Sequence, residues 1–307
     1  MKYYIETINK LIDKVKNIEL ISETSNKVFK VTTESNEILY VKFYENNSYH
    51  IDLELKLYNL IDNKYLKELY CEPLNSSVAV FRKLVGKTID ELNNEELIKY
   101  SDKIIDSLCD YLDTLSLTKV NGYGALDNNL NGKYDNFINF LKERQGSTSK
   151  QLKNYRDLTV ISDIIFDEYE DIIFSDNSLT PIDNNMKNIM LTNDGNIKFI
   201  DPGEMISAPI LMGYGDFVAH SYKTILYDKL IKKLKLTKND EKLLRIYAIF
   251  SSLNILAFLS KLGVDNLDSV IPYGNTYTFY NLIFDHLENL NIGREKVKEY
   301  SIKKNNS

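Results

Sequence analysis

Regular alternation of apolar and polar residues predicts an antiparallel sheet near the N-terminus. Residues 28–33 and 37–44 each alternate, and the polar turn Glu34-Ser35-Asn36 separates them. Two such runs joined by a short turn are typical of paired antiparallel strands. Residues 1–18 carry apolar side chains at helical spacing, so we expect an amphipathic helix that leads into the sheet.

The pattern becomes helical after about residue 93. Apolar residues spaced along one face predict a long helix before Gly122, namely Leu97, Ile104, Ile105, Leu108, Leu112 and Leu115. The longest apolar run, 246–259, is interrupted by Ser and Asn and is shorter than the ~20 residues of a membrane span. We therefore expect a buried helix there and no membrane association. The predicted fold class is α+β, with a small sheet lobe over 1–84 and a mainly helical lobe over 85–307.

One short stretch carries the clearest chemistry. The apolar runs 189–191 and 197–200 flank an Asn-Asp-Gly-Asn turn, which predicts a β-hairpin. Asn188 stands just before its first strand and Asp201 just after its second, while Asp183 lies five residues upstream of Asn188. This order suits phosphoryl transfer, which needs one carboxylate for the attacking hydroxyl and an amide and a carboxylate for Mg²⁺. The alternative is an ordinary surface hairpin whose Asx residues cap turns.

Two charged residues upstream fit the same chemistry. Lys42 lies among apolar residues in the second predicted strand, where a kinase carries the lysine that holds the α- and β-phosphates. A helical pattern follows at 51–61, and Glu54 on it is the natural ion-pair partner for Lys42, with Asp52 as a competitor. Taken singly, each residue is more typical of a solvated surface, but their order along the chain favours a kinase.

These motifs together resemble the aminoglycoside phosphotransferase and choline kinase-like family, which has a two-lobed protein-kinase-like fold. Four further segments carry the resemblance, over roughly residues 20–225. They are the nucleotide loop with Ser25 and Asn26, the last sheet strand and hinge at 78–86, the Gly-aromatic-Gly segment at 121–124, and the helix start at 213–219, where Asp216 is expected to brace the catalytic loop.

The resemblance implies a small-molecule kinase. It would transfer the γ-phosphoryl group of ATP or GTP to a hydroxyl of an aminoglycoside, another antibiotic, a sugar or an amino alcohol. Asp183 would be the base, and Asn188 and Asp201 the Mg²⁺ ligands. The nucleotide would be held by Lys42, Glu54, Ser25 and Asn26. Protein substrates are disfavoured because no recognisable activation segment follows Asp201.

Two departures from the family pattern keep a second hypothesis open. The family usually has a histidine two residues before the catalytic Asp, where it mainly braces the loop, but this chain has Pro181. Residues 21–30 contain no glycine, so close approach to phosphates would depend on small polar residues such as Ser22 and Ser25. The alternative is a catalytically degenerate kinase-like binding or scaffold protein.

Composition excludes several other classes. With 43% hydrophobic and 27% charged residues among 307, the chain predicts a globular protein of more than one compact lobe. Cys71 and Cys109 have no metal-site spacing, and the N-terminus lacks a signal-peptide pattern, so we expect a cytoplasmic protein without disulfides. A net charge of −6 and the short cluster Lys232-Lys233-Lys235 argue against nucleic acid as a partner.

The acceptor is the open question. Residues 204–307 hold 14 basic and 11 acidic residues, a net of +3, which is not an acidic surface for a polycation. Acidic residues instead gather just before the catalytic loop, and they form either a solvated face or one wall of a cleft: Asp163, Asp167, Glu168, Glu170, Asp171 and Asp176. Tyr273 and Tyr277 could stack on a sugar or cap an amine. His220 and His286 are interpreted as packing or surface residues, and the tail over 298–307 is expected to fray.

Overall fold

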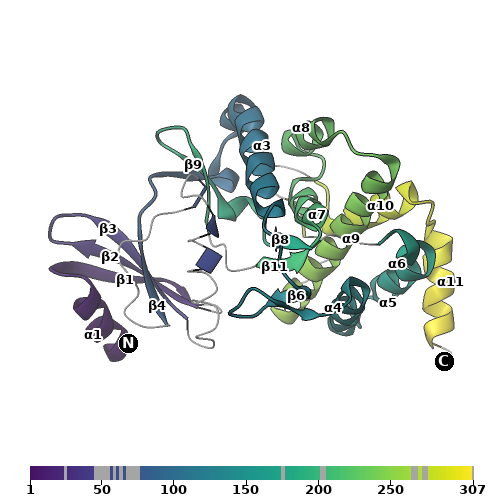
Figure 1. Ribbon diagram of the computed structural model, residues 1–307, viewed down its shortest axis with the longest axis horizontal. Coiled ribbons are helices and arrows are strands. Elements are labelled where there is room, and N and C mark those ends of the chain that lie inside the picture. The colour runs from purple at the N-terminus through teal and green to yellow at the C-terminus, as the bar shows by residue number, and fades with distance from the viewer. Residues whose placement is uncertain are drawn as a thin grey trace. The chain divides into compact units, whose positions relative to one another are not determined.

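A computed structural model describes residues 1–23, 26–44, 56–57, 60–61, 65–66, 77–173, 177–200, 205–263, 269–271 and 276–305 (Figure 1). Two compact units divide the chain. Unit 1 comprises Met1–Lys87, Asp127–Asn129 and Met190–Gly203, and unit 2 comprises Thr88–Leu126, Leu130–Ile189 and Glu204–Ser307. From Met190 on, the hairpin predicted at 189–200 therefore belongs to unit 1, although it follows much of unit 2 in sequence.

Unit 1 is built on a four-stranded antiparallel sheet in the order β1-β2-β3-β4. The strands are β1 (Val15–Glu23), β2 (Lys27–Thr33), β3 (Ile38–Phe43) and β4 (Val78–Arg82). Helix α1 (Lys2–Leu11) packs on one face, where Ile8 and Ile12 join a fully buried cluster with Phe29, Val31, Leu39, Val41, Phe43, Val78 and Val80. The predicted strand pair at 28–33 and 37–44 is confirmed.

The predicted N-terminal helix is wrong at its C-terminal end. Helix α1 stops at Leu11, and β1 begins at Val15. Lys14 takes a left-handed backbone with φ of 52°, which ends the helical path between the two elements. The apolar side chains of Val15 and Ile18 then reach the same core from a strand.

The predicted hairpin is confirmed as β9 (Ile189–Thr192) and β10 (Ile197–Phe199), which join β5 (Gly86–Thr88) in the order β10-β9-β5. The Thr192 hydroxyl closes the turn by donating to Asp194 and by accepting the Asn196 amide at 3.0 Å. Gly195 has φ of +80°, the conformation that glycine adopts without strain. The Asp-Gly pair thus supplies the turn that the sequence indicates.

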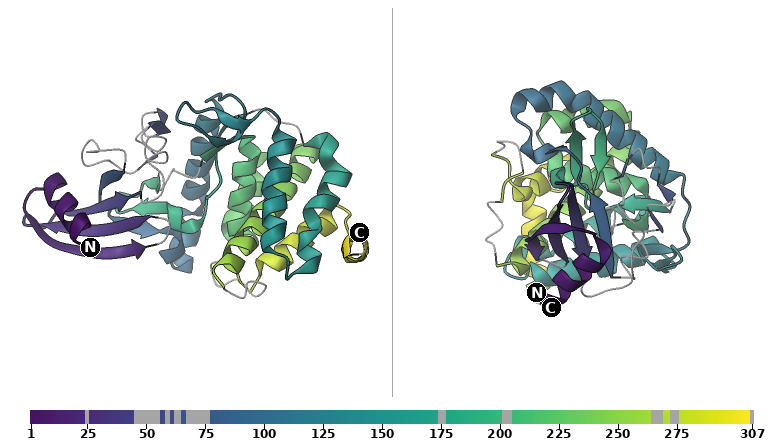
Figure 2. Two further views of the ribbon diagram at one scale, coloured as in Figure 1. Left: turned by 90° about the horizontal axis from the view of Figure 1, so that it is seen from below. Right: turned by 90° about the vertical axis from the view of Figure 1, so that its left-hand side faces the viewer.

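Unit 2 is mainly helical. Its helices are α3 (Asn94–Ser116), α4 (Phe137–Gln151), α5 (Arg156–Thr159), α6 (Ile161–Tyr169), α7 (Ile210–Ser221), α8 (Ile225–Leu234), α9 (Lys238–Lys261), α10 (Phe279–Asn289) and α11 (Arg294–Asn305). A small sheet in the order β7-β6-β11-β8 comprises β6 (Tyr123–Leu126), β7 (Gly132–Tyr134), β8 (Ser178–Pro181) and β11 (Met205–Ala208). Several of the helices run side by side in the left view of Figure 2.

Helix α9 is the core of unit 2. It contacts α4, α7 and α10, and most of its apolar residues from Leu243 to Ala257 are buried. Its length and composition would allow it to cross a membrane, but 61% of its most apolar window is buried inside the unit, as in a core helix. The expectation of a buried helix at 246–259 is confirmed, and the helix predicted before Gly122 is α3, capped reciprocally by Asn93 and Glu96.

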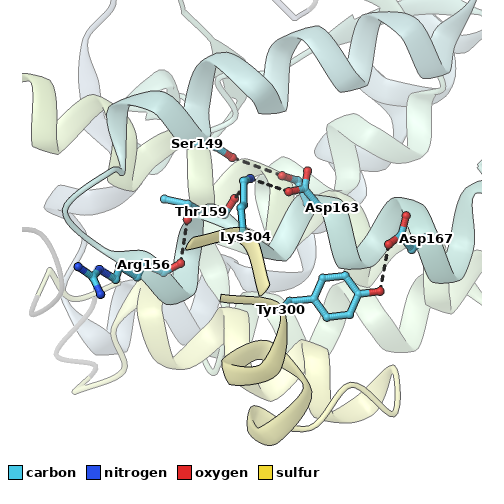
Figure 3. A network of polar contacts seen from close by, with 8 residues as sticks. Ser149, Arg156, Thr159, Asp163, Asp167, Tyr300 and Lys304 are labelled. Atoms are coloured by element: carbon cyan, nitrogen blue, oxygen red, sulfur yellow. Dashed lines mark hydrogen bonds and ion pairs between the residues drawn. The ribbon is translucent and has the colours of Figure 1, made fainter. Parts of the chain in front are cut away.

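The predicted fraying of the tail is wrong as far as Asn305, because α11 is a helix held on α5 and α6. Figure 3 shows Lys304 and Tyr300 reaching α6, with 2.6 Å from Lys304 Nζ to Asp163 Oδ2 and 3.0 Å from Tyr300 Oη to Asp167 Oδ2. Lys296 Nζ lies 2.5 Å from Glu168 Oε1. The buried Val297 and these polar contacts thus hold α11 on the rest of unit 2.

Gly215 lets α7 approach α9 closely. A Cβ atom at this position would lie 2.5 Å from Tyr247 Cβ, whereas one at Gly146 on the exposed side of α4 would meet nothing within 4 Å. We predict that Gly215→Ala lowers the free energy of unfolding by about 1–3 kcal/mol, because overpacking exceeds the gain in helix propensity.

Gly146→Ala is the matched control, and we expect it to raise stability by about 0.5–1 kcal/mol. Urea unfolding monitored by circular dichroism measures both variants. Equal shifts in the same direction would contradict the close α7–α9 contact.

Candidate active site

Asp183 lies in the loop between β8 and the short helix η3 (Met186–Asn188), and two asparagine amides hold its carboxylate. Asn185 Nδ2 donates to Asp183 Oδ1 at 2.5 Å, and Asn188 Nδ2 donates to Asp183 Oδ2 at 2.8 Å and to its carbonyl at 3.0 Å. Asn185 is itself fixed, because its Oδ1 accepts the Lys187 amide at 2.8 Å. The carboxylate therefore has one defined orientation.

Partial burial raises the pKa of Asp183 above its ordinary value of 3.8. The negative charge of Asp216 adds to this shift, whereas the amides of Asn185 and Asn188 and the nearby His220 oppose it. A raised pKa makes a carboxylate a better proton acceptor. The environment thus suits a general base.

A buried network anchors this loop to two helices. Asp216 of α7 is 5% exposed, and its Oδ2 accepts the Asn184 amide at 2.7 Å while its Oδ1 accepts the hydroxyl of Ser251 on α9. The Asn184 side chain donates to the Gly213 carbonyl at 3.0 Å and to the Pro181 carbonyl at 3.2 Å. The expected contact of Asp216 with the loop that carries Asp183 is confirmed.

The amide of Asn188 fits a role as a metal ligand. Its two side-chain hydrogen bonds to described residues both use Nδ2, so its Oδ1 is left as an acceptor that no donor in the described part of the chain reaches. Mg²⁺ prefers such oxygen ligands. Asp201 lies outside the described residues, and the described His, Cys, Asp and Glu residues include no group of three that could hold a metal alone.

The predicted nucleotide residues belong to unit 1. Lys42 on β3 pairs across the sheet with Val28 and Ala79, is 7% exposed, and has its Nζ 4.8 Å from the centre of the Tyr44 ring. Asn26 forms the bend that precedes β2. Glu54 and Ser25 lie outside the described residues. Because Lys42 is buried, the alternative interpretation of a solvent-facing strand lysine is wrong.

Three residues of the loop network were not predicted from the sequence, namely Asn184, Asn185 and Ser251. Ser251 had a visible signal, since it interrupts the long apolar run of α9 and a polar residue there needs a buried partner. Asn184 and Asn185 lie next to Asp183 but looked like ordinary turn residues. Their partners are 2 to 32 positions away, and the distant ones were not apparent from local spacing.

A second polar cluster lies where α7, α8, α9 and α10 meet. The hydroxyls of Tyr222 and Tyr277 both donate to Asp285 Oδ2, at 3.1 and 2.6 Å. The Tyr222 ring packs on His286, whose Nδ1 lies 3.2 Å from an Arg245 guanidinium nitrogen. His286 is 1% exposed, and the half-buried His220 packs on Phe279, so both histidines are packing residues as expected. Tyr273 lies outside the described residues.

The double acceptor role of Asp216 leads to a stability prediction. Asp216→Asn turns an NH₂ group toward the Asn184 amide or the Ser251 hydroxyl, so we expect the free energy of unfolding to fall by about 2–3 kcal/mol. Ser251→Ala removes one donor and should cost about 1 kcal/mol.

Asp171→Asn, at an exposed position, controls for the loss of charge and should leave stability within about 0.5 kcal/mol. Chemical denaturation of the three variants measures these differences. A null effect of Asp216→Asn would contradict the buried network.

His286 leads to a pH prediction. Burial, with smaller contributions from the positive charges of Arg245 and Lys223, lowers the pKa of His286 from 6.5 to about 3. The unfolded chain therefore binds a proton below pH 6.5 that the folded chain does not, and stability falls as pH falls. We expect His286 to account for a loss of ~2 kcal/mol between about pH 7 and 5.

His286→Gln keeps an acceptor for Arg245 but does not titrate. The pH dependence of urea unfolding should therefore be shallower for this variant by that amount, whatever its stability at pH 7. Parallel curves for the two proteins would show that His286 is not held neutral.

The chain is similar to known proteins in structure, whereas comparison of its sequence with family models and curated proteins finds no match. Among solved structures, aminoglycoside phosphotransferase APH(4)-Ia superposes with a TM-score of 0.64 at 12% identity over 98% of both chains. Choline kinase LicA from Streptococcus pneumoniae superposes with a TM-score of 0.64 at 16% identity over 94% of this chain and 98% of its own.

A third structure, that of an aminoglycoside 2′-phosphotransferase-IIIa variant, gives a TM-score of 0.62 at 11% identity over 98% of both chains. At such identities the likeness is one of fold. It agrees with the antiparallel sheet of unit 1 and the helices of unit 2. The chain therefore has the two-lobed, protein-kinase-like α+β fold that aminoglycoside phosphotransferases and choline kinase share.

Proposed function

We propose that this protein is a small-molecule kinase that transfers the γ-phosphoryl group of a nucleoside triphosphate to a hydroxyl of its acceptor. The observation that carries the proposal is the Asp183 carboxylate, oriented by Asn185 and Asn188 in a loop that Asp216 anchors. Phosphoryl transfer asks the protein mainly for positioning and charge stabilisation, and such a loop supplies a fixed proton acceptor.

The other residues have roles that follow from their chemistry. Asn188 and Asp201 would hold Mg²⁺, which would supply positive charge against the phosphates. The buried ammonium of Lys42 would pair with the α- and β-phosphates, with Glu54 as its partner and Ser25 and Asn26 in the nucleotide loop. Asp183 would accept the proton of the attacking hydroxyl.

The ligands of the structural neighbours support this proposal. A variant of APH(4)-Ia was crystallised with ADP and hygromycin B, LicA with AMP, and the 2′-phosphotransferase with GDP. Alanine variants of APH(4)-Ia change an aspartate and an asparagine five positions later, the same spacing as Asp183 and Asn188. The donor would accordingly be ATP or GTP and the acceptor a hydroxylated small molecule such as an aminoglycoside, another antibiotic, a sugar or an amino alcohol.

The acidic run on α6 does not support a polycationic acceptor. Four of its carboxylates have partners within unit 2: Asp163 with Lys304, Asp167 with Tyr300, Glu168 with Lys296 and Glu170 with Lys142. Three of the six carboxylates of the run are thus paired with a lysine of a neighbouring helix, as in a solvated face. Acceptors with few positive charges should be screened first.

The rival hypothesis is a kinase-like binding or scaffold protein without turnover, which the replacement of the family histidine by Pro181 suggests. The buried network around Asn184 and Asp216 speaks against it, because the loop is anchored without that histidine. A degenerate protein has no need of a carboxylate whose two oxygens are both held by amides.

The test is Asp183→Asn, for which we expect turnover to fall by about 10²–10⁴-fold because the proton acceptor is lost. A panel of hydroxylated acceptors with ATP and with GTP, monitored by release of the diphosphate, measures turnover. Thermal stability with excess Mg²⁺-nucleotide measures binding, which should persist in Asp183→Asn and weaken in Asp201→Asn.

Asp171→Asn is the control and should match the wild type in both assays. Full turnover by Asp183→Asn would remove the base assignment. Nucleotide binding by the wild type without turnover of any acceptor would favour the scaffold hypothesis.

A further inference from the structure

Position 181 lacks the side chain that the resemblance leads one to expect before the catalytic aspartate. Proline has no backbone N–H and no polar side-chain group, so Pro181 offers the loop only its carbonyl oxygen. That oxygen lies at the end of β8, where Pro181 pairs with Met205 of β11. A side chain that anchors the loop must therefore belong to another residue, and the Pro181 carbonyl needs a hydrogen-bond donor.

Asn184 meets both requirements. It is 4% exposed, and its Nδ2 donates both hydrogens, to the Pro181 carbonyl at 3.2 Å and to the Gly213 carbonyl at 3.0 Å. Its backbone amide donates to Asp216 Oδ2 at 2.7 Å. The residue directly after Asp183 is thus tied to the strand before the loop and to helix α7.

The space around Asn184 is tightly packed. A Cβ atom at position 213 would lie 3.2 Å from the Pro181 carbonyl oxygen and 3.4 Å from the side chains of Leu112 and Thr180. The glycine lets α7 come close enough to β8 for one amide group to reach a carbonyl on each element. An apolar side chain of similar size would fit the volume but would leave both carbonyls without a donor.

We propose that Asn184 is the positioning residue of the catalytic loop and supplies the brace that the family histidine would otherwise give. It acts through the peptide that follows Asp183, and hence on the direction in which the Asp183 carboxylate points, without contacting substrate. The proposal rests on the proposed function only where it concerns turnover. The anchoring of the loop is a separate property that can be measured without any substrate.

The first measurement is hydrogen exchange of Asn184→Leu by mass spectrometry. We expect peptides covering 182–190 to exchange about tenfold faster or more than in the wild type, because the loop opens locally when its anchors are lost. Peptides of α9 should keep their protection. Asn254→Leu is the matched control, since it removes an asparagine of the same unit that accepts a hydrogen bond from Thr148 and makes no bond to Asp183, Asn184 or Asp216.

The second measurement is turnover on whichever acceptor the wild type phosphorylates. Asn184→Leu should lower kcat by about 10- to 100-fold, because a small misplacement of a catalytic group has that effect, and leave the KM for nucleotide within about twofold. Asn254→Leu should change neither value. A merely structural asparagine would alter stability alone and leave kcat per folded molecule unchanged.

The outcomes separate clearly. Unchanged hydrogen exchange at 182–190 together with unchanged kcat in Asn184→Leu would overturn the proposal. Equal effects of Asn184→Leu and Asn254→Leu on exchange and on kcat would also overturn it. If the wild type turns over no acceptor, the proposed function fails, while the exchange result still decides whether Asn184 anchors the loop. Asn184→Ala, which leaves room for water at the two carbonyls, replaces Asn184→Leu if that variant does not fold.

Discussion

The carboxylate of Asp216 connects the parts of unit 2 that give the loop around Asp183 its shape. A buried charge is costly unless donors surround it, and here the donors come from two different places in the chain: the amide of Asn184 and the hydroxyl of Ser251. Without Asp216, the Asn184 amide and the Ser251 hydroxyl would both lose their buried acceptor. The Asp216 carboxylate on α7 therefore fixes the positions of the loop and of α9 relative to α7. The orientation of Asp183 follows from this arrangement.

Packing supports the same arrangement. Gly213 and Gly215 lie on α7 within three residues of Asp216, and each removes a side chain where another element comes close: β8 in one case and α9 in the other. A larger residue at either position would push α7 away from a partner of the network. Hydrogen bonding and close packing therefore constrain the same few residues, which explains why a loop with polar, turn-forming residues is well defined.

Much of the fold could be predicted because its signals are local. The two-residue period of β2 and β3, the Asp-Gly turn of the β9–β10 hairpin and the apolar run of α9 each lie within a few residues of one another. The loop network could not be predicted, because Asn184 bonds Gly213 and Asp216, 29 and 32 residues away, and Asp216 also bonds Ser251, 35 residues away. The end of α1 depends on one left-handed residue, Lys14, which no apolar pattern marks. Helix α11 has few apolar residues and docks through Val297 and contacts to residues more than 120 positions away, so no local pattern marks it.

The pairing of α11 with α6 has a kinetic consequence. Each of its bonds to the acidic run joins residues more than 120 positions apart in the chain. Until α11 has been synthesised and docked, the carboxylates of α6 face one another without these cations, and their mutual repulsion opposes the helix. Contacts of such sequence separation form late and slowly. The segment around α6 should thus be among the last parts of a newly made chain to become stable.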